Sequence, residues 1–388
     1  MGANRFITHS VRDARITRIL GAAIDAVEPG KLVQKYLQRA DLPKYDRVFL
    51  LGIGKASESM TQAAAKFLNN FTDALIITKR ASSLTRERIA VMESGHPIPD
   101  ERSLAAGEAA LDFVSDLKEN DLLVCLISGG ASALVTAPRP GFSLEEIQSK
   151  TASLLASGAT INEMNAIRRQ MDRIKGGGLA RATKAKIISL ILSDVIGNSL
   201  ETIASGLTVD SSLGTRVQNF IIGDIRVAAQ AAQRQAAIEG LDSEILDLQI
   251  RGQAKEIGLR LAKRLKEEIQ KRKTPFCLIA GGETTVILNG NGKGGRNQDL
   301  ALAAVHELSG MEDILFVSLA TDGNDGPTDA AGAVVNGETR QRAERLGMSA
   351  SDYLSRNDAY SFFDPLNDLI KCGYTGTNVN DLIFLIGL

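Results

Sequence analysis

The chain has 388 residues, of which 44% are hydrophobic, so it is long enough for a large core and for two domains. Its formal net charge of −1 argues against a general nucleic-acid binder, which needs a basic face, and no apolar run approaches the roughly 18 residues of a membrane helix. With charged residues near the N-terminus and only three cysteines, we expect a cytoplasmic protein with reduced thiols and with no nucleic-acid or membrane partner.

The first half of the chain alternates between predicted helices and strands. Residues 10–28 show the helical spacing of apolar side chains, and RVFLLGIGKAS (47–57) begins a strand, a glycine loop and a helix. Further elements are predicted at 74–78 (strand), 101–118 (helix), 122–135 (strand, loop and helix), 143–156 and 161–174 (helices) and 187–194 (strand). Because these strands are continuous apolar runs between helices, they predict a parallel α/β sheet that is covered on both faces.

The second half begins with a helix-rich stretch over residues 220–273, which contains one short strand near 245–250. Strands are then predicted at 276–280, 284–288, 314–320 and 381–387, and a helix is predicted at 296–309. The first two of these strands are adjacent and indicate a hairpin before a glycine-rich loop. We assign residues 1–240 to an N-terminal domain and residues 241–388 to a C-terminal domain.

One glycine-rich loop follows the apolar strand that ends at Ile127. Its glycines let backbone N–H groups approach an anion, and the start of a helix adds a favourable dipole. We predict that the loop binds phosphate or carboxylate, and a tight turn that binds nothing is the alternative. The residues concerned are Ser128, Gly129, Gly130 and Ser132.

A second loop, Gly52 to Ser57, adds a lysine to a similar strand–loop–helix pattern. It is not a Walker A loop, because no glycine stands at the required upstream position and Ala56 replaces the Ser or Thr after the lysine. Lys55 can act as a point charge on phosphate or carboxylate oxygens. An ordinary surface lysine is the alternative.

The third loop spans residues 290–298 and contains a formal G-x-G-x-x-G match. A dinucleotide site therefore stays open, but cations with neighbouring amides suit a triphosphate better. We predict that this loop binds the phosphates of a nucleotide through Gly292, Lys293, Gly294 and Gly295, and that Arg296 and Asn297 bind the substrate.

Carboxylates follow several of the predicted strands. Asp322 and Asp325 share one short loop with Asp329, and oxygen ligands of this kind suit a nucleotide-borne Mg²⁺; turn capping is the alternative. Asp194 ends a buried strand, where it can orient or deprotonate a hydroxyl group, and Glu283 is a further candidate for substrate binding. His96 is either a proton shuttle or a structural turn residue.

A set of short motifs runs in one order along nearly the whole chain. They are GIGKAS (52–57), SGHPIPD (94–100), ISGGASALV (127–135), LLASGATINEMNAIRR (154–169), IKGGGLA (174–180), LSDVIGNSLETIASG (192–206), AGGETTV (280–286), GKGGRNQDLALA (292–303), ATDGNDGPTDAAGAVV (320–335) and TGTNVNDL (375–382). Together they resemble the class II glycerate kinase family, which joins an N-terminal glycerate-kinase domain to a C-terminal MOFRL domain. Ala131 departs from the family's pattern, which has a third glycine there.

The resemblance implies a large Rossmann-like α/β/α domain and a smaller α/β MOFRL domain with an active cleft between them. It implies transfer of phosphate from ATP, with Mg²⁺, to C2 of D-glycerate, and it points to Lys55 and Arg296 as functional residues. We expect both cations to neutralise the transferring phosphoryl group and the substrate carboxylate, with Asp194 acting on the acceptor hydroxyl.

Two rival functions remain at this stage. An NAD(P)H-dependent hydroxypyruvate reductase fits the formal dinucleotide match, and a non-catalytic sugar-acid sensor is a third reading. All three take a small molecule as ligand, and the sequence leaves a homodimer open.

Overall fold

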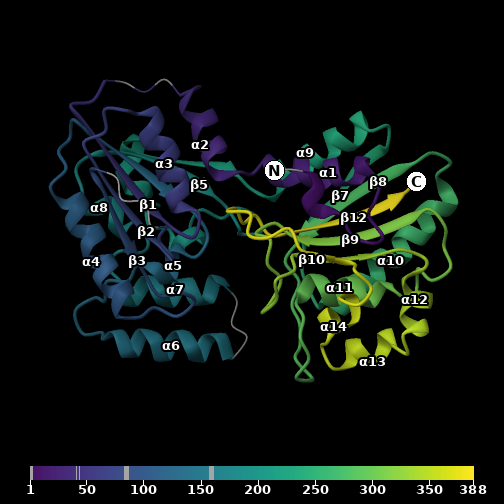
Figure 1. The fold of residues 1–388 in the computed structure, drawn as a ribbon. Coiled ribbons are helices and arrows are strands. Elements are labelled where there is room, and N and C mark those ends of the chain that lie inside the picture. Colours follow the sequence, from purple (N-terminus) through teal and green to yellow (C-terminus); the bar gives the residue numbers. More distant parts are fainter. Residues whose placement is uncertain (1–2, 41, 43, 83–86, 157–160) are drawn as a thin grey trace. The chain divides into compact units, whose positions relative to one another are not determined.

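A computed structural model describes residues 3–40, 42, 44–82, 87–156 and 161–388 (Figure 1). The chain divides into two units: the first unit comprises Pro29–Asp224, and the second unit comprises residues 1–28 with Ile225–Leu388. Residues 157–160, inside the motif at 154–169, lie outside the described part of the chain.

The first unit is built on a six-stranded sheet in which every neighbouring pair of strands is parallel. The strand order is β3-β2-β1-β4-β5-β6, the doubly wound order of dinucleotide-binding folds, so the predicted Rossmann-like class is confirmed. Its elements are α2 (Pro29–Leu37), β1 (Arg47–Ile53), α3 (Ser57–Phe67), β2 (Asp73–Thr78), β3 (Ile89–Glu93), α4 (Glu101–Ser115), β4 (Asp121–Ile127), α5 (Ala131–Leu134), α6 (Leu144–Ala156), α7 (Ile161–Met171), α8 (Gly178–Arg181), β5 (Lys186–Leu192) and β6 (Val217–Gly223).

The inner strands of this sheet are buried on both faces. Side chains alternate between the two faces along each strand, and both sets are covered. Leu51 of β1 and Cys125 of β4 share one buried cluster with Ala106 and Ala110 of α4. Leu50, the neighbour of Leu51, is fully buried on the opposite face, and α3 contacts β1 and β2. This two-sided burial explains why the strands are continuous apolar runs.

The second unit carries a mixed six-stranded sheet in the order β11-β10-β9-β12-β8-β7. Only β7 and β8 pair in parallel; the last strand, β12, lies antiparallel between β8 and β9. Figure 1 shows α1 and α9 on one side of the sheet and α10 and α11 on the other. The elements are α1 (Ala14–Asp25), α9 (Ile225–Ile238), β7 (Asp242–Ile250), α10 (Ala254–Lys271), β8 (Phe276–Gly282), α11 (Arg296–Ala304), β9 (Ile314–Ala320), β10 (Gly332–Val335), α12 (Thr339–Arg345), α13 (Ala350–Ser355), α14 (Ala359–Phe363), β11 (Leu369–Ile370) and β12 (Asp381–Gly387).

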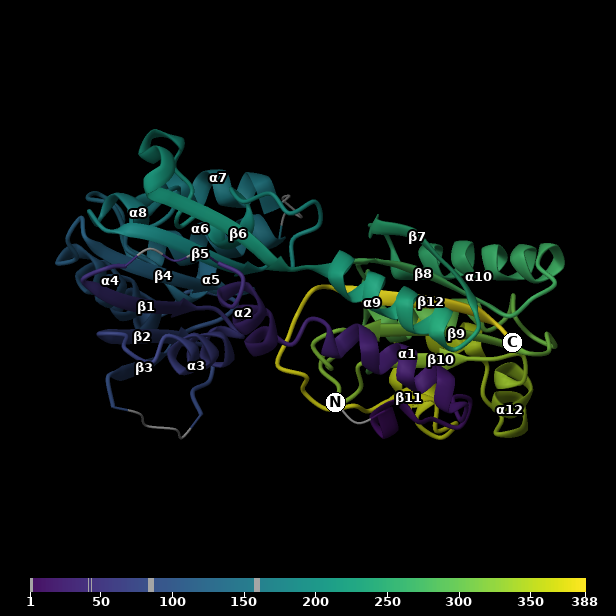
Figure 2. The ribbon, with the colours of Figure 1, turned by 90° about the horizontal axis from the view of Figure 1, so that it is seen from above.

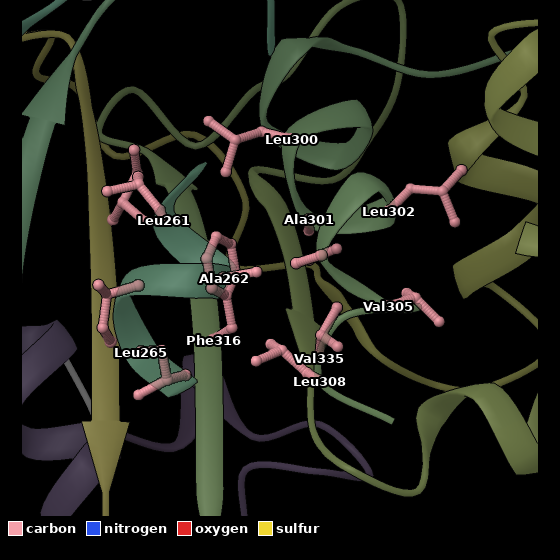
Figure 3. Close-up of a cluster of buried hydrophobic side chains, with 14 of the residues drawn as sticks. Leu261, Ala262, Leu265, Leu300, Ala301, Leu302, Val305, Leu308, Phe316 and Val335 are labelled. Carbon is pink, nitrogen blue, oxygen red and sulfur yellow. The ribbon is translucent and has the colours of Figure 1, made fainter. Parts of the chain in front are cut away.

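The core of this unit packs α10 and α11 against the sheet (Figure 3). Leu261 and Leu265 come from α10, Leu300 comes from α11, and Phe316 of β9 lies between the layers with no exposed surface. This packing fixes the position of α11, whose first residues carry the charged side chains described below.

The N-terminal segment belongs to the second unit through specific contacts. The amide of Ser10 donates to Asp368 Oδ1 (2.8 Å), the hydroxyl of Thr377 donates to the carbonyl of Val27 (2.7 Å), and α1 packs on α9 (Figure 2). The division into units therefore differs from the expected boundary between residues 240 and 241. Within the described residues, no helix combines the length and apolar character needed to cross a membrane.

The predicted strands at 314–320 and 381–387 are confirmed at their bounds. The strand predicted at 284–288, and with it the hairpin, is wrong: this segment forms only an isolated bridge between Thr285 and Gln253. The helix predicted at 296–309 ends at Ala304 and continues as turns. Four of the observed strands were not predicted. β3 and β6 are only partly buried, whereas β10 and β11 are buried but span only four and two residues.

Candidate functional site

In the first unit, the loops after β1 and β4 meet at the point where the strand order reverses. The amide of Lys55 donates to the carbonyl of Gly129 (3.0 Å), and the amide of Ala56 donates to the hydroxyl of Ser128 (3.0 Å). Ligands of open α/β sheets bind at the carboxyl ends of the strands at such a switch point. The two glycine-rich loops predicted from the sequence therefore form one structure.

Three predicted side chains converge on the glycines of this structure. A Cβ atom on Gly129 would lie 2.0 Å from Asp194 Oδ2, so only glycine leaves room for this carboxylate. Gly130 has a φ of +88°, and a Cβ there would lie 3.1 Å from the ring of His96 and 3.3 Å from Cγ of Lys55. These contacts bring together residues that the sequence separates by more than 100 positions.

The same loop leaves donors available for an anion. Within the described part of the chain, the amides of Gly129 and Gly130 donate no hydrogen bond, and the ammonium group of Lys55 forms no ion pair. Ala131 begins α5 and is not among the residues with positive φ, so an alanine is accommodated there without strain. The hydroxyl of Ser132, by contrast, is engaged with that of Ser205.

His96 is electrically neutral at physiological pH. Burial, and to a smaller extent the cations Lys55, Lys79 and Arg168, lower its pKa to about 4. Its Nδ1 atom is buried and has no hydrogen-bond partner in the described part of the chain. A neutral imidazole beside a lysine can donate to or accept from a ligand without adding charge.

Arg168 of α7 is a cation that our sequence reasoning did not select. Burial lowers its pKa, and Asp172 partly offsets that effect. The nearby Lys175 and Asp172 form a buried ion pair, which also accepts hydrogen bonds from Thr136 (2.7 Å) and Ala137 (3.1 Å) and is therefore structural. The pair Arg168 and Arg169 at the end of a predicted short helix could have indicated this cation in the sequence.

The second unit places its candidate residues at one edge of its sheet, where β8 and β9 end and β12 begins. The Nε and NH2 groups of Arg296 donate to the two carboxylate oxygens of Asp381 (2.6 and 3.1 Å), and the NH1 group lies 3.1 Å from Glu283. Burial alone would lower the pKa of Arg296, but these two carboxylates raise it above its ordinary value. Asp381 was missed from the sequence; the signal was an acidic residue opening a fully buried strand.

Asp325 caps the N-terminus of α11. Its carboxylate accepts hydrogen bonds from the amides of Asn297 (3.1 Å) and Gln298 (2.9 Å) and from the Gln298 side chain (3.1 Å). Burial and the charge of Asp381 raise its pKa to about 6. Since only 2% of Asp325 is exposed, the structure favours the capping alternative over the predicted metal role.

Asp322 is better placed for a cation, because it is only partly buried. Its Oδ1 accepts from the amide of Asn324 (2.9 Å) inside the loop after β9. Mg²⁺ typically takes one or two carboxylates together with substrate phosphates, and Asp322 fits that requirement. Among the described residues, no group of three His, Cys, Asp or Glu side chains is arranged to hold a metal by itself.

The glycine-rich loop after β8 packs on the segment before α14. The amide of Gly292 donates to the carbonyl of Arg356 (3.1 Å), that of Lys293 donates to Asp358 (3.0 Å), and the Lys293 ammonium lies 3.7 Å from the Tyr360 ring centroid. Two of the four amides predicted to bind phosphate, those of Gly292 and Lys293, therefore already donate hydrogen bonds within the protein. A dinucleotide fingerprint follows its strand directly, whereas this match begins at Gly290, well after β8 ends at Gly282, so it lacks its structural context.

Family models match most of the chain. The model described as a domain of unknown function, DUF4147, matches residues 15–237, and the model described as the MOFRL family matches residues 276–381. The D-glycerate 2-kinase of Thermotoga maritima is 38% identical over 95% of this chain and 96% of its own length. The glycerate 2-kinase of Pyrococcus horikoshii is 35% identical over the same shares.

Solved structures agree with these matches. A glycerate kinase from Thermotoga maritima superposes with a TM-score of 0.89 at 36% identity, covering 96% of this chain and 98% of its own. A protein from Pyrococcus horikoshii gives a TM-score of 0.81 at 34% identity and covers 98% and 99%, respectively. With both domain models in place and full-length relatives above 30% identity, the chain belongs to the glycerate kinase family that joins a DUF4147 domain to a MOFRL domain.

Proposed function

We propose that this protein is a glycerate 2-kinase, which transfers the γ-phosphoryl group of ATP to the C2 hydroxyl of D-glycerate. Full-length relatives of that activity support the reaction. The observation that carries the proposal is the turn at Gly129 and Gly130, where open amides, a lysine and a neutral histidine meet. Such a site binds an anionic substrate and leaves its hydroxyl group within reach of a base.

In the first unit, Lys55 and the two glycine amides bind the negative oxygens of the phosphoryl group or of the glycerate carboxylate. Asp194, held against Gly129, accepts the proton of the C2 hydroxyl as its oxygen attacks the γ-phosphorus. The bond from that phosphorus to the bridging oxygen of ADP then breaks. Ser128 fixes the turn through its hydrogen bond to Ala56, and Ser132 supports it through Ser205.

In the second unit, Arg296 stabilises the charge of the transferring group while Asp381 and Glu283 hold its guanidinium in place. Glu283 is the proposed contact to the substrate. Asn297 is not, because its buried side chain donates to Asp325 (3.3 Å) and accepts from the hydroxyl of Ser318 (2.6 Å). Gly294 and Gly295, whose amides donate no hydrogen bond within the described residues, are the proposed phosphate contacts. When bound with ATP, Mg²⁺ would supply further charge neutralisation, and Asp322 is the carboxylate that would hold it.

The test is a pair of assays on the purified protein. ADP release with D-glycerate, and 2-phosphoglycerate identified by NMR, are expected; oxidation of NAD(P)H with hydroxypyruvate in place of phosphoryl transfer would support the reductase instead. Lys55→Met should lower kcat/KM roughly 10²- to 10³-fold, because one preorganised charge is lost. The control Lys66→Met, on the exposed end of α3, should keep the full rate.

A cytoplasmic location and a homodimer are further expectations of this proposal. Fractionation of cells and the mass of the protein in solution test them separately.

A further inference from the structure

Arg168 of α7 is a half-buried cation without a partner of its own. Within the described part of the chain, its guanidinium forms no hydrogen bond or ion pair, and burial lowers its pKa more than the nearby Asp172 raises it. Asp172 cannot serve as its partner, because the acceptor positions of that carboxylate are already filled. They accept from the amides of Ala137 (3.1 Å) and Ile174 (3.0 Å), from the hydroxyl of Thr136 (2.7 Å) and from the ammonium of Lys175.

The charges around Arg168 do not balance. A cavity of about 10 Å³, lined by residues of α6 and α7, has Lys150, Arg168, Lys175 and Asp172 as the charged members of its wall. Lys150 is exposed to solvent, and Lys175 is paired with Asp172. The positive charge of Arg168 therefore remains, and removing a charge from water is costly unless it is paired. Since the cavity has room for about one water molecule, the anion that completes the arrangement lies outside it.

The contacts of α7 place Arg168 beside the glycine loop that follows β4. Ser132 of α5 lines the same cavity as Arg168, and its hydroxyl is hydrogen-bonded to that of Ser205. The Ser205 hydroxyl in turn donates to Asn165 Oδ1 (2.8 Å). Asn165 precedes Arg168 by three residues on α7, so the two side chains are neighbours on the helix surface. This chain of hydrogen bonds ties Arg168 to the loop.

The turn that carries Ser205 is held in an unusual conformation. Ala204 and Ser205 have φ values of 53° and 56°, which are uncommon for residues other than glycine. Such a conformation persists only where the surroundings enforce it, and it is concentrated at ligand sites. Here Asn165 also donates to the carbonyl of Thr202 (2.9 Å), and the amide of Gly176 donates to the carbonyl of Ser205 (2.9 Å). The fold thus maintains a strained turn whose contacts position α7.

The neighbours of Arg168 indicate which anion it binds. Arg168 lies near enough to His96 for its charge to lower the pKa of that imidazole. The ring of His96 stands against Gly130, and Asp194, the proposed base, stands against the adjacent Gly129. Consecutive Cα atoms are about 3.8 Å apart, so the two side chains border a space of the size of a small molecule. In a 2-hydroxy acid the hydroxyl and the carboxylate are on adjacent carbons and fit such a space together.

The shape of the cation also selects its ligand. The planar guanidinium fork of an arginine matches a carboxylate in two parallel hydrogen bonds, whereas a lysine acts as a point charge. We propose that Arg168 binds the carboxylate of the acceptor acid, which leaves Lys55 and the glycine amides for the phosphoryl group. Lys79, the third cation near His96, is exposed and contributes only a screened charge. The substrate class is then a small 2-hydroxy acid with a free carboxylate.

This inference rests on the proposed kinase function, and its test separates the two. The experiment measures equilibrium binding of D-glycerate to the full-length protein by calorimetry, and the KM values of D-glycerate and of ATP. Arg168→Met should weaken glycerate binding and raise the KM of glycerate roughly 10²-fold, because a desolvated carboxylate loses its partner, and should leave the KM of ATP unchanged. The control Arg169→Met, whose guanidinium donates to the carbonyl of Glu201 (3.3 Å), should bind glycerate as the wild type does.

Glycerate affinity that Arg168→Met leaves unchanged would overturn the assignment, and so would a rise in the KM of ATP in place of that of glycerate. Arg168→Lys keeps the test decisive if the methionine variant folds poorly. It retains the charge without the fork, so it should weaken glycerate binding about tenfold, and full affinity in this variant would also overturn the proposal. A wild-type protein that binds D-glycerate through Arg168 but transfers no phosphate to it would contradict only the kinase function.

Discussion

His96 links the electrostatics of the first unit to its stability. Its pKa of about 4 is depressed by burial and then by Lys55, Lys79 and Arg168. Between about pH 6.5 and pH 4 the unfolded chain binds the proton and the folded chain does not. The stabilisation is therefore present above about pH 6.5 and is lost as the pH falls toward 4.

We predict that His96→Gln removes this part of the acid sensitivity, because a glutamine has no proton to gain. The measurement is the Tm of the wild-type protein and of the variant from pH 7.5 to pH 4.5. The control His306→Gln, at an exposed position in the second unit, should leave the profile of the wild-type protein in place. Parallel profiles for the wild type and His96→Gln would show that His96 is not the buried neutral group described here.

The sequence allowed individual candidate residues to be selected, but it did not reveal which side chains bind one another. Lys55, Asp194 and the glycines of the first loop were selected because they follow buried strands, and the sheet does bring them together. The pairing of Arg296 with Asp381 spans 85 positions and depends on how β12 is inserted between β8 and β9. No local pattern in the sequence contains that information.

At the scale of elements, α11 depends on a cap supplied from another loop. We predict that Asp325→Ala destabilises the second unit by about 2–4 kcal/mol, because the buried amides of Asn297 and Gln298 lose their acceptor. Since the pKa of Asp325 is raised to about 6, its contribution is greatest at low pH and declines as the pH rises through 6. The measurement is denaturant unfolding at pH 5 and at pH 8.

The exposed control Asp329→Ala should change the free energy of unfolding by less than about 1 kcal/mol. If Asp325 were chiefly a Mg²⁺ ligand, its removal would instead raise the Mg²⁺ concentration needed for activity and leave the free energy of unfolding nearly unchanged.

The elements that the sequence predicted well share one property, which is burial on both faces. β9 and β12 are buried at every position, and their bounds were predicted correctly. β3 and β6 lie at the two edges of their sheet and are half-exposed, so their apolar pattern is broken. The segment at 284–288 has β-forming residues, but Ile287 and Leu288 are exposed and find no partner strand within the described residues.

At the scale of the whole molecule, the charged groups of the proposed reaction come from two different units. The chain passes from one unit to the other between residues 28 and 29 and returns between residues 224 and 225. Lys55 belongs to the first unit and Arg296 to the second. Each unit has its own buried core, so a substitution at either cation can be made without removing core contacts of the other unit.

We predict that the effects of Lys55→Met and Arg296→Gln on kcat/KM are not additive. If both cations stabilise the same transferring phosphoryl group, each single variant loses most of that stabilisation, and the double variant should be slower than the worse single variant by far less than the product of the two losses. The measurement is a double-mutant cycle on kcat/KM at saturating Mg²⁺, with unfolding curves of all four proteins to establish that each unit stays folded. Losses that multiply would mean that the two cations act on separate groups or in separate steps.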